Sequence, residues 1–426
     1  MHPLLAPVRT VVRHRGFMVL LACNILVGLA FAFVSPFFSM YGTIEVGMPP
    51  VVFGVFMTVT SVSGIAISTM LARWSDTRLS RRTVLLLGGI AGTLGYVVYA
   101  FVRDVAWLTL NGCVLMGIAS ITFSQLFAHA RDLLARSDTA PKDAPLYMNV
   151  FRLFFALSWT VGPAVAAFVM QRYSYRGTFL VAGLCFLLFV LAVLRFVPAV
   201  PPSSQARAAA EQVPLRRVLM RRDVLAHFLA FAVLYVAGTM AVMNLPLLVL
   251  QTLGGTSSHV GIIYSVAPVF EIPFMFFFGL LATKGDQARL IRIAAILAIA
   301  YYGLLAVVRT PQQIYPVQIL SAAITAVIGG VAITFFQNFI PDQPGTATNL
   351  YSTATRIGST TGYLLFGVLA AAFGHRAVFT ACAGLSVLAA LFLFCAASRR
   401  KVVLAAGIVK DAPRSSAPPH ENPDRR

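Results

Sequence analysis

The chain has 426 residues, of which 58% are hydrophobic and only 11% are charged, and its mean hydropathy is +0.82. A water-soluble domain of this length needs far more polar surface, so the composition excludes one. The formal net charge is +19, but the basic residues occur in short runs between apolar segments rather than on one face. This pattern indicates cytoplasmic loops beside anionic lipids and argues against nucleic-acid binding.

Apolar segments long enough to cross a bilayer recur along the whole chain. They predict an all-α membrane protein with twelve transmembrane helices in two six-helix halves. The expected spans are residues 17–41, 51–72, 83–102, 105–129, 147–171, 178–198, 224–250, 258–282, 289–308, 313–338, 346–373 and 377–397.

Polar segments divide the chain into four parts. Residues 1–198 form an N-terminal six-helix half and residues 223–398 a C-terminal six-helix half. Between them, residues 199–222 are rich in Pro, Ser, Ala and Arg, which predicts a cytoplasmic linker. Residues 399–426 are expected to form a disordered cytoplasmic tail. Strongly basic loops alternate with weakly basic ones, so both termini of this multi-pass bacterial inner-membrane protein are expected in the cytoplasm.

Short matches between the two halves suggest an internal repeat. Asn149 and Gly162 in the fifth span have the same spacing as Asn349 and Gly362 in the eleventh. Together with the central linker, these matches favour a parallel duplication of six helices.

The loop after the second span carries a recognisable motif. Residues 72–82 read ARWSDTRLSRR, with a small residue, an Asp and a basic pair. This resembles the signature loop of the major facilitator superfamily, although Ala72 replaces the usual Gly. The resemblance implies the superfamily fold. It also implies a conformational latch in which Asp76 pairs with basic groups across a helix contact. The candidate latch residues are Asp76, Arg73, Arg81 and Arg82.

The resemblance narrows to one branch of that superfamily. The segments GVFMTVTSVSGIAISTMLARWSD, SQLFAHARDLL, SWTVGPAVAAF, EIPFMFFFG and FQNFIPDQPGTATNLY, which extend from the second span to the eleventh, are similar to bacterial sugar efflux transporters of the SET type. This resemblance implies export of sugars or glycosides, in exchange for protons. The chain departs from the family pattern at Asn244 and Asn338, where the family often has Asp. We expect a monomer.

Two ionisable residues lie near the expected bilayer centre. Glu271 is about 20 Å into the eighth span, and Arg356 is about 15 Å into the eleventh from the opposite face. Such groups are costly in lipid and usually face a cavity or a partner. We expect them to form a proton-coupling pair, and a purely structural counter-ion role for Glu271 is the alternative.

Several polar and aromatic residues within spans are candidates for substrate binding. Amides, a cation and an aromatic ring suit sugar hydroxyls and ring faces, but amides also hold membrane helices together. Gly162 and Pro163 predict a kink in the fifth span. The binding candidates are Asn24, Gln125, Asn149, Arg152, Trp159, Asn244, Gln337 and Asn349.

Other functions fit the sequence less well. A proton-coupled exporter of amphipathic drugs is the main alternative, because Phe and Met suit greasy substrates. An enzyme is not expected, since the chain has no phosphate-binding glycine loop, zinc-binding spacing or nucleophile elbow. A sensor would need an output domain. The five cysteines form no paired motif, so we predict no metal and no cofactor.

Overall fold

The computed structural model describes residues 15–77, 79–136, 144–198, 220–340 and 344–405 of the chain. Most of the expected 199–222 linker lies outside these residues. The N-terminal half begins with a 20-residue helix, as its apolar run predicts. Its elements are α2 (Arg15–Val34), η1 (Ser35–Phe37), α3 (Phe38–Met40), η2 (Tyr41–Glu45), α4 (Pro50–Thr77), α5 (Arg81–Phe101), α6 (Val105–Cys113), α7 (Leu115–Ala119), α8 (Ile121–Arg136) and α9 (Ala144–Phe196).

The C-terminal half has a similar series of helices. Its last helix continues to Ala405, inside the segment that the sequence assigned to a tail, and residues 406–426 lie outside the described part. The elements are α11 (Arg222–Leu247), η5 (Leu248–Thr252), α12 (Ser257–Lys284), α13 (Gln287–Val307), η6 (Pro311–Gln313), α14 (Ile314–Thr325), η7 (Ala326–Val331), α15 (Ala332–Phe339) and α16 (Pro344–Ala405).

Ten helical segments of the described chain are long and apolar enough to cross a membrane. Two of them have 47 and 52 residues, whereas one crossing needs about 20. The two breaks are at Ser174 in α9 (φ 58°) and Gly374 in α16 (φ 76°), which interrupt the helical backbone. Each break falls where the sequence predicts a short connection between two spans. If both long helices cross twice, the number of crossings is the predicted twelve.

Polar residues in the connections start several of the helices. Ser80 accepts a hydrogen bond from the backbone N–H of Thr83 at 3.1 Å and caps α5. Asp104 accepts from two backbone N–H groups at 3.0 Å and caps α6. Asp286 accepts from the backbone N–H of Ala288 at 2.9 Å and caps α13. These side chains satisfy donors that have no partner within the helix. The short polar loops therefore fix where the spans begin.

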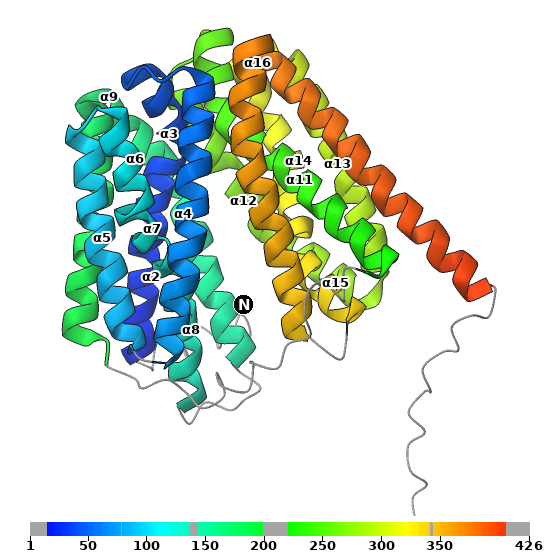
Figure 1. Cartoon of the computed structure of the whole chain (residues 1–426), viewed down its shortest axis with the longest axis horizontal. Coiled ribbons are helices and arrows are strands. Elements are labelled where there is room, and N and C mark those ends of the chain that lie inside the picture. The colour runs from blue at the N-terminus through cyan, green and yellow to red at the C-terminus, as the bar shows by residue number, and fades with distance from the viewer. Residues whose placement is uncertain (1–14, 78, 137–143, 199–219, 341–343, 406–426) are drawn as a thin grey trace, which may run out of the picture.

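The two halves stand side by side, with α2–α9 in one and α11–α16 in the other (Figure 1). Within each half a long helix is the hub: α9 packs on α2 and α5, and α16 packs on α11 and α13. We call the end with the connections at 77–81 and 284–287 the basic end, because Arg73, Arg81, Arg289 and Arg292 flank them. The end with the turns at 46–49, 102–104 and 253–256 is the opposite end.

Candidate functional site

At the opposite end the halves meet through glycines on α4 and α16. A Cβ atom on Gly54 would lie 3.0 Å from the Cα of Gly367, and one on Gly367 would lie 2.5 Å from the carbonyl oxygen of Pro50. Only a residue without a side chain permits this approach. Two turns further along α4 from this contact, the hydroxyls of Ser61 and Thr360 are 3.0 Å apart. Backbone contact and polar bonds thus close the seam between the halves here.

A second glycine closes the seam between α9 and α12. A Cβ on Gly261 would lie 2.7 Å from both the Pro163 carbonyl oxygen and the Ala167 Cβ. One turn further along α12, the Ser265 hydroxyl accepts a hydrogen bond from the backbone N–H of Ala164 at 3.2 Å. That N–H follows Pro163 in the sequence, where proline loosens the helical bonding. The predicted Gly162–Pro163 element therefore lies at an interface between the halves.

Toward the basic end, α4 and α16 line a cavity between the halves, together with α2, α5, α7 and α11. α4 and the first part of α16 diverge in that direction (Figure 1). One part of the cavity, of about 510 Å³, is lined from both halves. An adjoining part, of about 780 Å³, lies between α4 and α16. The described lining includes the aromatic residues Phe31, Phe38, Tyr96, Tyr99 and Tyr363, the hydroxyl residues Thr60, Ser61, Ser68, Ser120, Ser352, Thr353, Thr355 and Ser359, and the polar residues Asn349 and Arg356.

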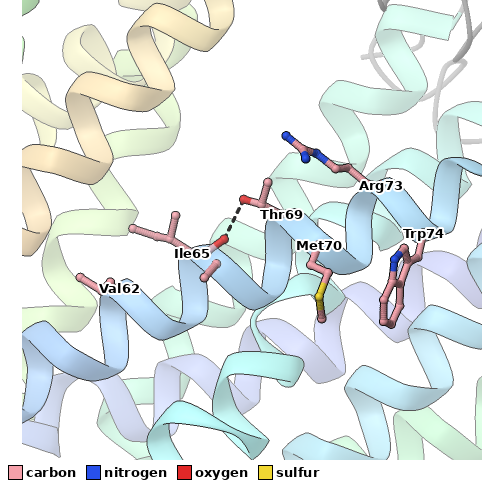
Figure 2. A pocket seen from close by; sticks show the side chains of 7 residues that line it. Val62, Ile65, Thr69, Met70, Arg73 and Trp74 are labelled. Atoms are coloured by element: carbon pink, nitrogen blue, oxygen red, sulfur yellow. Dashed lines mark hydrogen bonds between the residues drawn. The ribbon is translucent and has the colours of Figure 1, made fainter.

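The α4 wall of the cavity continues toward the basic end. Figure 2 shows Ile65, Thr69 and Arg73 along one side of α4, while Met70 and Trp74 point to another side. The Thr69 hydroxyl donates to the Ile65 carbonyl oxygen at 2.7 Å. This bond folds the hydroxyl back onto its own helix. The α4 wall thus carries apolar and hydroxyl groups along its length and a cationic group, Arg73, nearest the basic end.

Arg356 lies in the cavity rather than in an ion pair. Its side chain is exposed and lines both parts of the cavity. α16 begins at Pro344, so Arg356 is about 18 Å along the helix from the basic end, close to the middle of a bilayer core. Among the described residues, no ion pair or hydrogen bond to its guanidinium is formed.

The expected pair of Glu271 with Arg356 is therefore wrong for this conformation. Glu271 is half-buried on α12, and its carboxylate forms no hydrogen bond or ion pair within the described part of the chain. Depth alone motivated the pairing, and depth does not fix the direction in which a side chain points. The role of Glu271 in proton coupling is not tested by this placement.

Most of the predicted amide contacts hold helices together. The buried Asn24 donates to the Phe151 carbonyl oxygen at 2.6 Å, which joins α2 to α9. The buried Asn244 donates to the backbone carbonyl oxygen of His375 at 2.8 Å, and its own side-chain oxygen is 2.7 Å from the ring of the same histidine. Both polar groups of Asn244 are thus engaged. Gln337 donates to the Thr348 hydroxyl at 3.0 Å. In this structure these three amides join helices, which is the alternative to substrate binding that the sequence left open.

The other binding candidates are divided by their position. Asn349 is exposed and lines the cavity. Arg152 is exposed on α9, and Trp159 is half-buried there with an indole N–H that finds no acceptor in the described chain. Neither is among the residues that line the cavity. The side chain of Asn149 lies outside the described residues.

The predicted latch residues lie around a buried polar cluster at the basic end. The Nε of Arg81 donates to Asp132 Oδ2 at 2.6 Å, and its Nη1 donates to Gln125 Oε1 at 3.1 Å. Ser75 donates to the same Gln125 oxygen at 3.0 Å. Gln125, predicted to bind substrate, is thus part of this cluster. These contacts join α4, α5 and α8 within the N-terminal half.

The other latch candidates are Arg82, Arg73 and Asp76. Arg82 donates to the Leu194 carbonyl oxygen at 2.7 Å on α9, within the same half. Arg73 is exposed at the cavity mouth. The side chain of Asp76 lies outside the described residues. Their role as a latch stays a prediction.

The sequence pointed to Asn349 and Arg356 but not to the hydroxyl groups beside them on the face of α16 that lines the cavity. Asn349, Ser352, Arg356, Ser359 and Tyr363 recur at intervals of three and four residues, so they share one helix face. An unusual density of Ser and Thr within an otherwise apolar span was the available signal. Among the described residues, no three His, Cys, Asp or Glu side chains are grouped as a metal site would need.

Comparison with known proteins agrees with this architecture. The sequence profile of the Major Facilitator Superfamily matches residues 20–346 and 228–419. The chain is 34% identical over 380 residues to a putative sugar efflux transporter of Deinococcus radiodurans, covering 89% of this chain and 97% of that protein. It is 29% identical to sugar efflux transporter A of Dickeya chrysanthemi, covering 83% and 88% of the two chains.

Solved structures show the same fold at low sequence identity. The nucleoside transporter NupG superposes with a TM-score of 0.74 at 15% identity, covering 90% of this chain and 99% of that one. A bacterial homologue of the human lysosomal transporter Spinster, in an inward-facing and occupied conformation, gives a TM-score of 0.73 at 14% identity, covering 91% and 97%. This multi-pass membrane protein is thus a transporter, not an enzyme, and it belongs to the sugar efflux transporter family of the major facilitator superfamily.

Proposed function

We propose that this protein exports sugars or glycosides across the bacterial inner membrane, by alternating access and in exchange for protons. The basic end then faces the cytoplasm, because arginine-rich loops are retained on that side and near anionic lipids. In this orientation the cavity opens to the cytoplasm and the seam between the halves is closed on the outside. This is the conformation in which an exporter loads its substrate.

The observation that carries the proposal is the chemistry of the cavity lining. Hydroxyl, amide and guanidinium groups recur beside tyrosine and phenylalanine rings. Sugars are bound by such polar groups, which pair with their hydroxyls, and by aromatic rings, which cover the apolar faces of the sugar ring. The relatives named sugar efflux transporters favour the same substrate class.

Glu271 is our candidate for the proton carrier. It is half-buried within a span and carries no compensating partner among the described residues. A carboxylate at membrane depth is costly as an anion, so a neutral, protonated state is favoured when the site dries and an ionised one when it is wet. Alternating access changes the wetting of the site, which allows one proton to be bound and released per cycle.

Export of amphipathic drugs is the second candidate. Met57, Met116 and Met243 line the part of the cavity that has a volume of about 510 Å³, and methionine adapts to varied apolar ligands. A distant relative, 22% identical over 326 residues, is a class D tetracycline resistance protein from Salmonella ordonez. The number of hydroxyl groups in the lining favours sugars over such compounds.

Uptake into inverted membrane vesicles tests the proposal. Vesicles that contain the protein should accumulate labelled methyl glucoside or glucose when a proton gradient, acidic inside, is imposed. They should lose that uptake when an uncoupler collapses the gradient. Uptake of cationic dyes and tetracycline, with none of the sugars, would establish the drug exporter instead. Sugar uptake that is unchanged by the uncoupler would contradict exchange for protons.

A further inference from the structure

The charged side chains in the described part of the cavity lining are all of one sign. Arg356 lines both parts of it, and Arg73 lines its mouth along α4. No Asp or Glu is found among the described residues of the lining. A cavity with cationic walls of one sign concentrates anions and repels cations. A strictly neutral substrate would not need this asymmetry.

Arg356 is also available to a ligand. Among the described residues its guanidinium has no acidic or carbonyl partner. A charged group at membrane depth without a partner marks a substrate or ion pathway more often than a structural site. Arginine, unlike lysine, presents a planar fork that matches a carboxylate or a phosphate with two parallel hydrogen bonds.

Neutral groups flank the guanidinium on the same face of α16. Ser352 is one turn before Arg356, Ser359 is one turn after it, and Asn349 and Tyr363 extend the row in both directions. We call these five residues the α16 row. The hydroxyl and amide groups suit sugar hydroxyls, and the tyrosine ring suits the face of a sugar ring. The row thus places a cation in the middle of a sugar-binding surface.

We propose that the preferred substrates are sugars with an anionic group, a carboxylate or a phosphate, which Arg356 binds through its guanidinium. This inference rests on the proposed sugar export and specifies its substrate class. Glucuronate and glucose 6-phosphate represent the two kinds of anion. Glucose represents the neutral ring, and glucosamine represents a cationic one.

Binding to the purified full-length protein in detergent tests the proposal, with dissociation constants measured for all four sugars. At least one anionic sugar should bind about tenfold or more tightly than glucose, because a hydrogen-bonded charge pair contributes at least that factor. Glucosamine should bind more weakly than glucose. In Arg356→Gln the advantage of the anion over glucose should disappear. Arg356→Lys, which keeps the charge but loses the fork, should fall between the two.

Arg309→Gln is the matched control, since it removes one positive charge from an exposed position in the connection after α13 at the opposite end, away from the cavity. It should keep the wild-type preference. Equal affinity of the wild type for glucose and both anions would overturn the inference. So would an Arg356→Gln variant that loses affinity for glucose and for the anions by the same factor. Counterflow in proteoliposomes separates the two proposals. Transport of glucose without any preference for anions removes only the anionic substrate class, whereas transport of no sugar removes the proposed function as well.

Discussion

The close contact at Gly367 provides a direct test of how the halves move. Replacing Gly367 by Val places a branched side chain where even a Cβ would lie 2.5 Å from the Pro50 carbonyl oxygen and 3.1 Å from the Gly54 Cα. Both neighbours are backbone atoms, so neither can move aside as a side-chain tip would. The strain can be relieved only if α4 and α16 separate at the opposite end.

The size of the effect follows from the cost of overpacking. Extra side-chain atoms in a tight contact typically cost about 1–3 kcal/mol. If that strain exists only while this end is closed, the ratio of open to closed molecules should rise about 5- to 150-fold. A state that is rare in the wild type would then become readily detectable.

Spin-label distances measure this ratio. Labels at Ile44→Cys and Val307→Cys report on the opposite end, because both positions are exposed and belong to different halves. Cys395, the exposed native cysteine, is first changed to Ser. Gly367→Val should add or enlarge a population with a longer distance.

The matched control for this substitution is Gly384→Val. It lies on the same helix, and a Cβ there would meet no atom within 4 Å. It should leave the distance distribution as in the wild type. If Gly367→Val also leaves the distribution unchanged while the protein stays folded, the reasoning that this glycine contact sets the closed state is refuted.

Three further predictions concern the polar groups. Arg81→Gln should lower the free energy of unfolding by about 3–5 kcal/mol, because it leaves the carboxylate of Asp132 buried without its partner. The side chains of Arg81 and Asp132 are only 9% and 13% exposed. A loss below about 1 kcal/mol in a denaturation series would contradict a buried pair. Asn244→Ala should cost about 1–2 kcal/mol in the same assay, since it removes the link between α11 and α16; unchanged stability would show that the link contributes nothing. Glu271→Gln should leave the protein inserted and folded but make transport insensitive to the proton gradient, and a wild-type pH profile of vesicle uptake would reduce the residue to a structural role.

The sequence by itself determined the membrane character, the fold class and the order of the helices. These follow from local properties: the length of each apolar run and the charge of each loop. Even the interruptions of the two longest helices fall where short connections were predicted, at Ser174 and Gly374. Motifs spread over most of the chain also identified the family.

Tertiary structure decided which polar residues face the cavity. Asn24, Asn244 and Gln337 were plausible sugar contacts in the sequence, yet each donates a hydrogen bond to another helix. Arg356 was expected to neutralise Glu271 and instead lines the cavity. Amides and charges are costly in lipid whichever role they have, so their presence in a span marks an interior position only. The rotation of each helix, set by packing contacts such as Gly54 against Gly367, determines whether that interior position is a helix interface or the transport path.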